Sequence, residues 1–127
     1  MDMKEEFKVF VYGTLMKGQA NHDMMKGAIY EGKYKTDDRW GLINIGAFPA
    51  LVPHVLAVEG EVYTVNKKTL ELLDRLEGVA GGMYKRRYIY VFDEDGVRDE
   101  VYTYIWGTVA SPSEIKLARW SDFQCSL

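Results

Sequence analysis

Most hydrophobic positions of this chain fall in short runs rich in β-branched and aromatic residues, the pattern typical of β-strands. The run 84–92 also alternates along its length, and a turn at 93–96 separates it from a further run, which predicts a β-hairpin. Gly60 interrupts one of the runs and predicts a bulge or a close approach of two backbones. We expect strands over residues 7–12, 28–35, 40–45, 55–65, 84–92 and 97–106.

One segment has a helical period instead. Leu70, Leu73 and Leu76 lie on one face of a helix, because residues three or four apart share a face. Asn66 precedes this segment and can accept hydrogen bonds from its first N–H groups, while Gly78 follows it and suits the residue after a helix end. The sequence therefore predicts a helix between Asn66 and Gly78.

Two weaker signals predict short helices elsewhere. Residues 21–26 are expected to form a short helical turn, and Ser111-Pro112-Ser113-Glu114 is a capping box expected to open a short terminal helix. Strands and helices do not alternate along the chain as they do in a doubly wound sheet. We therefore expect an α+β fold with a barrel-like sheet.

The composition limits the possible functions. A chain of 127 residues, 47% apolar and 28% charged, is expected to form a single domain with room for one small-molecule pocket. A net charge of −3 provides no field for nucleic acid, and no stretch is long and apolar enough for a membrane span. Cys125 is the single cysteine, so no internal disulfide can form and a reducing cytoplasm fits. His22 and His54 do not have zinc-site spacing, so we expect no metal.

A glycine loop follows the first predicted strand. Residues 13–18 have the two glycines of a phosphate-binding loop, but Gln19 and Ala20 stand where lysine and a hydroxyl residue would contact phosphate and magnesium. An NTPase is thereby excluded. Successive backbone N–H groups of such a loop can still converge on a smaller anion such as a carboxylate. The alternative is a simple turn that ends the strand.

Glu77 is the leading catalytic candidate. It lies at the end of the predicted helix, where the partly negative carbonyl groups disfavour its charged form. Apolar neighbours would raise its pKa further, toward the range useful for general acid–base catalysis. The alternative is a solvated surface acid. His22 and His54 are more simply interpreted as loop histidines with ordinary hydrogen bonds, and the aromatic strand faces as core, with only Tyr84 considered for a pocket wall.

The chain resembles the gamma-glutamyl cyclotransferase family, and within it the gamma-glutamylamine cyclotransferase branch. The resemblance covers about residues 7–107. It is carried, in order and spacing, by Val11-Tyr12-Gly13-Thr14-Leu15, Gly18-Gln19-Ala20-Asn21-His22, Phe48-Pro49-Ala50, Gly60-Glu61-Val62-Tyr63, Leu73-Asp74-Arg75-Leu76-Glu77-Gly78 and Tyr84-Lys85-Arg86.

The resemblance implies a small mixed β-barrel with flanking helices and a cofactor-independent cyclisation. In that reaction the α-amine of a γ-glutamyl compound attacks its own side-chain carbonyl, forming 5-oxoproline and expelling an amine. By resemblance, Tyr12, Gly13, Thr14 and Leu15 hold the α-carboxylate and α-amine end, Tyr84 lines the pocket, and Glu77 is the acid–base residue. The rival hypotheses are a non-catalytic module that binds a small carboxylate or amide, and a protein-interaction module on the same fold.

Overall fold

The computed structural model describes residues 5–108, 110–111 and 113–124. Pro112 and Cys125 lie outside the described residues. Seven strands, two α-helices and two 3₁₀ helices follow one another along the described chain. Their bounds are β1 (Glu6–Val11), η1 (His22–Met25), β2 (Ile29–Thr36), β3 (Trp40–Asn44), β4 (Pro49–Pro53), β5 (Glu59–Asn66), α1 (Lys67–Leu76), η2 (Val79–Gly81), β6 (Tyr84–Phe92), β7 (Arg98–Trp106) and α2 (Trp120–Gln124).

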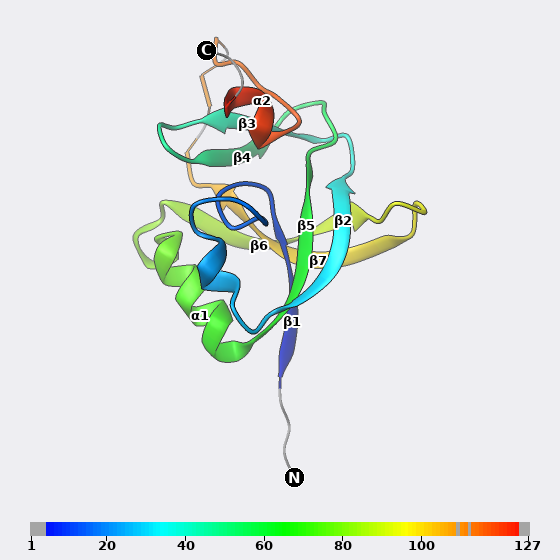
Figure 1. Cartoon of the computed structure of the whole chain (residues 1–127). Coiled ribbons are helices and arrows are strands. Elements are labelled where there is room, and N and C mark those ends of the chain that lie inside the picture. The colour runs from blue at the N-terminus through cyan, green and yellow to red at the C-terminus, as the bar shows by residue number, and fades with distance from the viewer. Residues whose placement is uncertain (1–4, 109, 112, 125–127) are drawn as a thin grey trace.

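The sheet closes on itself. The order of its strands is β1-β5-β2-β6-β7-β4-β3, and β7 pairs back onto β1 through Val9 and Tyr102. The strands β1, β5, β2, β6 and β7 therefore form a ring, with β4 and β3 continuing from β7 outside it (Figure 1). The β1–β7 and β4–β7 pairs are parallel and the other pairs are antiparallel. The expected α+β fold with a small mixed barrel is confirmed.

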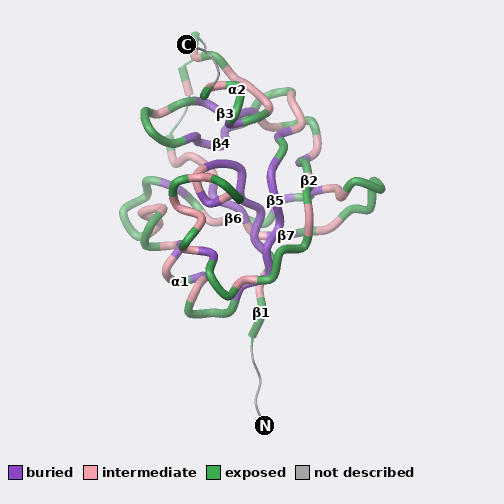
Figure 2. Tube along the Cα trace, viewed as in Figure 1, coloured by how far each residue is buried: buried purple, intermediate pink, exposed green. Residues whose placement is uncertain are grey.

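Helix α1 covers one side of this barrel next to the loop that follows β1 (Figure 1). Its start and end are those predicted, because the Asn66 side chain accepts a hydrogen bond from the Thr69 N–H at 2.8 Å and Gly78 adopts a left-handed conformation with φ of 63°. Leu70 and Leu73 are buried against the barrel, whereas Leu76 is 41% exposed. The buried positions run along the barrel strands and the inner face of α1 (Figure 2).

The expected strands are largely confirmed, with one strand missed. Strand β4 was not predicted, because prolines stand at both of its ends and proline disfavours strands. In the structure Pro49 and Pro53 occupy the first and last positions of β4. The expected strand 55–65 is wrong in its first part, since β5 begins at Glu59. Gly60 does mark a close approach, because a side chain there would lie 2.3 Å from the carbonyl oxygen of Val11.

The expected terminal helix at Ser111 is also wrong. The capping box forms in part: Glu114 Oε1 accepts a hydrogen bond from the Ser111 N–H at 3.2 Å. No helix follows, because Leu117 instead exchanges two backbone hydrogen bonds with Leu42 of β3, at 2.8 and 3.0 Å. Pairing with a strand far away in sequence overrides the local signal, and the helix begins only at Trp120. Among the described residues, no helix is long and apolar enough to cross a membrane.

Candidate active site

A pocket of about 350 Å³, its open mouth included, lies where the loop after β1, the turn before β4, the end of α1 and the strands β6 and β7 meet. The strand pairings bring these segments together from distant parts of the sequence. Its walls are aromatic and apolar apart from one carboxylate, which is typical of a small-molecule site. The lining residues are Phe10, Val11, Tyr12, Gly13, Thr14, Leu15, Phe48, Pro49, Glu77, Tyr84 and Tyr104.

The glycine loop reaches this pocket because Gly13 has no side chain. A Cβ atom at position 13 would lie 2.3 Å from Cγ of Pro49, so any other residue would push the loop and β4 apart. Within the part of the chain that the structure describes, the backbone N–H groups of Thr14 and Leu15 donate no hydrogen bond to protein. The loop therefore offers two successive N–H donors at a pocket wall.

The far side of the loop is fixed by side chains. Glu61, a carboxylate on β5 that is only 8% exposed, accepts hydrogen bonds from the Lys17 N–H at 3.0 Å and from the Tyr63 hydroxyl at 2.9 Å. Asn21 Nδ2 donates to Thr14 Oγ1 at 3.0 Å, and His22 Nδ1 donates to the Leu15 carbonyl oxygen at 2.9 Å. The loop is thus tied to the barrel. The anchoring role of Glu61 was not predicted.

Glu77 lies where α1 ends. Its backbone N–H donates to the Leu73 carbonyl at 2.9 Å, and the left-handed Gly78 then turns the chain away. This leaves the side chain of Glu77 at the pocket, where it is partly buried. Burial raises the pKa of Glu77 to about 7, because removal of water disfavours the carboxylate form. A group with this pKa accepts and donates protons with nearly equal ease at neutral pH.

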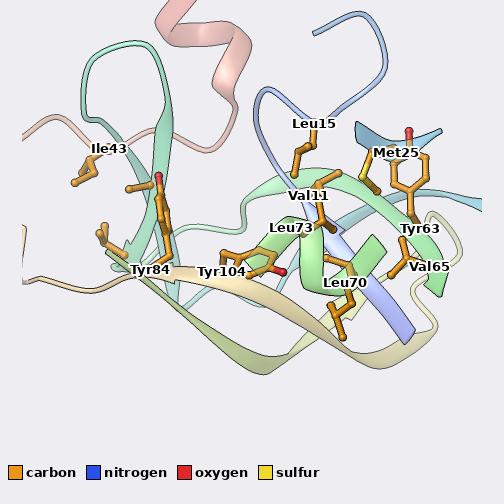
Figure 3. Close-up of a cluster of buried hydrophobic side chains, with 13 residues drawn as sticks. Val11, Leu15, Met25, Ile43, Tyr63, Val65, Leu70, Leu73, Tyr84 and Tyr104 are labelled. Carbon is orange, nitrogen blue, oxygen red and sulfur yellow. The ribbon is translucent and has the colours of Figure 1, made fainter. Parts of the chain in front are cut away.

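Three tyrosines share the pocket with this acid. The Tyr12 hydroxyl donates to the Tyr104 carbonyl oxygen at 2.5 Å, and the Tyr84 hydroxyl donates to the Pro49 carbonyl oxygen at 2.7 Å. Burial raises the pKa of Tyr12, Tyr84 and Tyr104, and the nearby negative charge of Glu77 raises each of them further. All three phenols therefore stay neutral at neutral pH. Figure 3 shows Tyr84 and Tyr104 within the cluster of buried side chains.

Tyr104 also links the pocket to helix α1. Its hydroxyl donates to Asp74 Oδ1 at 2.7 Å, and the other oxygen of Asp74 accepts a hydrogen bond from Arg86 at 2.6 Å. In Figure 3 the Tyr104 hydroxyl is directed toward the helix. Asp74 precedes Glu77 by one helical turn, so this network fixes the end of α1 against β6 and β7.

The structure brings all six sequence-predicted site residues into the lining of one pocket. Glu77, Tyr84 and the four loop residues Tyr12, Gly13, Thr14 and Leu15 are among them, and their individual roles stay predictions. Tyr104 and Phe48 were not predicted as site residues. The Phe-Pro pair stood among the motifs, but the strand that brings it to the pocket was missed. No group of three or more His, Cys, Asp or Glu that could hold a metal occurs in the described part of the chain.

Known proteins share this sequence and fold. A family model described as "Gamma-glutamyl cyclotransferase, AIG2-like" matches residues 9–122. A Vibrio cholerae protein named "Putative gamma-glutamylcyclotransferase" is 44% identical over 71 residues, which are 56% of this chain and 62% of that protein. A Methanocaldococcus jannaschii protein with a similar name is 34% identical over 100 residues, 77% of this chain and 82% of that protein. The crystal structure of a mouse AIG2-like protein is 29% identical with a TM-score of 0.74, covering 85% of this chain and 81% of that chain.

Proposed function

This chain belongs to the gamma-glutamyl cyclotransferase, AIG2-like family, and we propose that it cyclises the γ-glutamyl group of a γ-glutamyl amine or amino acid to 5-oxoproline with release of the free amine. The observation that carries the proposal is a carboxyl group of pKa about 7 in the same pocket as the glycine loop. The reaction needs one group that accepts a proton and later returns it. Glu77 has the pKa for both steps.

Binding and folding of the substrate is the first task. In this proposal the N–H groups of Thr14 and Leu15 hold the α-carboxylate, since no Lys, Arg or His is among the pocket's lining residues. The hydroxyl protons of Tyr12 and Tyr84 are already donated to backbone carbonyls, so toward the substrate these oxygens present only lone pairs. Such acceptors suit the N–H groups of the α-amine.

Holding the chain folded brings the α-nitrogen against the γ-carbonyl carbon. A well-oriented intramolecular attack of this kind can lower the barrier by roughly 7 to 11 kcal/mol relative to a bimolecular one. The nitrogen lone pair forms the new C–N bond and the carbonyl oxygen becomes an oxyanion. No water or cofactor is consumed, because the atoms of the substrate are divided between the ring and the departing amine.

Proton transfer completes the cycle. The Glu77 carboxylate removes the proton that the attacking nitrogen loses, and the carboxylic acid then gives it to the departing nitrogen as the old C–N bond breaks. At its ordinary pKa, Glu77 would be a weak base for an amine. Burial strengthens it as a base and still leaves about half of it ionised at pH 7.

The experiment is to incubate the purified protein with a panel of γ-glutamyl amines and γ-glutamyl amino acids and to measure 5-oxoproline by chromatography. Glu77→Gln is expected to lower kcat by at least about a hundredfold, as for loss of a general acid–base group. Glu71→Gln is the matched control, because Glu71 is an exposed acid on the same helix. The proposal is wrong if no substrate yields 5-oxoproline or if Glu77→Gln keeps full activity. Saturable binding without turnover would identify a binding module.

A further inference from the structure

A second pocket lies outside the candidate active site and shares no lining residue with it. Its volume is about 600 Å³, and it is formed by the end of β4, the outer face of β6, the end of β7 and the segment after β7. Tyr84 and Trp106 separate the two pockets, because their rings pack edge to face with centroids 5.2 Å apart. The lining residues are Val52, Pro53, His54, Lys85, Arg87, Ile105, Trp106, Gly107, Thr108, Ala110 and Lys116.

The titratable residues of this pocket are His54, Lys85, Arg87 and Lys116, and no acid is among its lining residues. This one-sided charge is notable in a chain whose net charge is −3. Lys85 and Arg87 are two residues apart on β6, so their side chains leave the same face of the strand. Among the described residues, neither forms an ion pair. Their mutual repulsion would be relieved by a bound anion.

The fold holds the other side of the pocket close to these cations. Gly41 of β3 lets two segments approach, since a Cβ atom there would lie 2.9 Å from Cβ of His54 and 3.3 Å from Cβ of Lys116. The Lys116 ammonium donates to the carbonyl oxygens of Ser111 and Glu114 at 3.1 and 3.0 Å. The segment after β7 is thus fixed beside β4, and its contacts define one wall.

The remaining wall is apolar and partly aromatic. Val52 is buried, and Ile105 and Trp106 at the end of β7 are partly exposed beside it. Lys85 pairs with Ile105 across the β6–β7 ladder, so a cationic and an apolar side chain are neighbours at this point. An indole face suits a flat ring, and a guanidinium together with an ammonium suits an oxyanion.

We propose that this pocket binds a small ligand made of an aromatic ring carrying an oxyanion, either a phosphate or a carboxylate. The ring lies against Trp106 and Ile105, and the oxyanion lies between Lys85 and Arg87. This inference does not depend on the proposed cyclotransferase activity, because it uses none of the residues of that site.

The test is an NMR titration of the whole chain with phenyl phosphate and, separately, with benzoate, observing the indole N–H of Trp106 and the amide of Gly107. Saturable shifts are expected with at least one probe, and the arm that binds more tightly identifies the preferred oxyanion. The double variant Lys85→Gln/Arg87→Gln should weaken that binding about tenfold or more, because two charge-assisted contacts are lost. The double variant Lys33→Gln/Lys35→Gln removes the same charge from another pocket and should leave binding unchanged.

Three outcomes would overturn the proposal. The first is the absence of shifts from either probe at millimolar concentration. The second is equal affinity in the wild type and the Lys85→Gln/Arg87→Gln variant, which would place the probes elsewhere. The third is binding of inorganic phosphate as tight as that of phenyl phosphate, which would show that the aromatic wall contributes nothing. Both substituted pairs are exposed on strands, so these variants should fold like the wild type.

Discussion

Glu77 should make the folded protein less stable at alkaline pH than its neutral counterpart does. In the unfolded chain this acid ionises near 4.5, and in the folded chain only near 7. Between these values the folded state holds a proton that the unfolded state has lost, so stability falls as pH rises from about 4.5 to 7 and stays lower above 7. Glu77→Gln removes this penalty because glutamine has the same shape and does not ionise.

The size of the effect follows from the two pKa values. Each pKa unit corresponds to about 1.4 kcal/mol, so the full difference is worth about 3 kcal/mol. One side of Glu77 faces the open pocket, where water screens its charge, which reduces the expected value. We therefore expect Glu77→Gln to gain about 1 to 2 kcal/mol in unfolding free energy over the wild type between pH 5 and pH 8.

Urea unfolding followed by circular dichroism at both pH values measures this difference directly. Titration of the other acids cancels, because the quantity compared is variant minus wild type at each pH. Glu71→Gln supplies the control, and its difference from the wild type should not change with pH, since Glu71 is exposed. A Glu77→Gln variant whose advantage is the same at pH 5 and pH 8 would refute the argument that burial perturbs this acid. No substrate is needed.

Three further substitutions probe the frame of the pocket. Gly13→Ala should cost about 1 to 3 kcal/mol in urea unfolding because its Cβ would overlap the proline ring behind it, whereas Gly81→Ala, with open space around it, should be close to neutral; equal effects would contradict the packing argument. Tyr104→Phe should cost roughly 1 kcal/mol by losing its hydrogen bond to the helix, and no loss would show that this bond does not support α1. Glu61→Ala should accelerate amide hydrogen exchange at Lys17 by about tenfold, whereas Glu61→Gln, which keeps an acceptor, should do so less; unchanged exchange in both would remove Glu61 as the loop anchor.

Local signals predicted a large part of the fold. The hairpin of β6 and β7 and the caps of α1 were predicted because turn residues, an N-cap and a C′ glycine act over only a few positions. Strand β4 and the late start of α2 were not predictable in this way. Proline argued against the strand and a capping box argued for an early helix, but pairing with distant strands decided both.

The candidate site divides in the same manner. Motif resemblance pointed to Glu77, Tyr84 and the loop 12–15, and the structure brings them to one pocket. Tyr104 could not be singled out, because aromatic residues that alternate along a strand are equally typical of a core. Its place depends on closure of the barrel, through which its carbonyl meets the Tyr12 hydroxyl and its own hydroxyl meets α1.

By itself, the sequence determined where most of the strands run, where α1 begins and ends, and that an acid stands at the end of that helix. These features depend on steric and hydrogen-bonding preferences within a few neighbouring residues. Only the tertiary structure decided that this acid is buried with a pKa of about 7. Burial is a property of what surrounds a group, and the surroundings of Glu77 come from β1, β4 and β7, which the closed barrel brings together from distant parts of the chain.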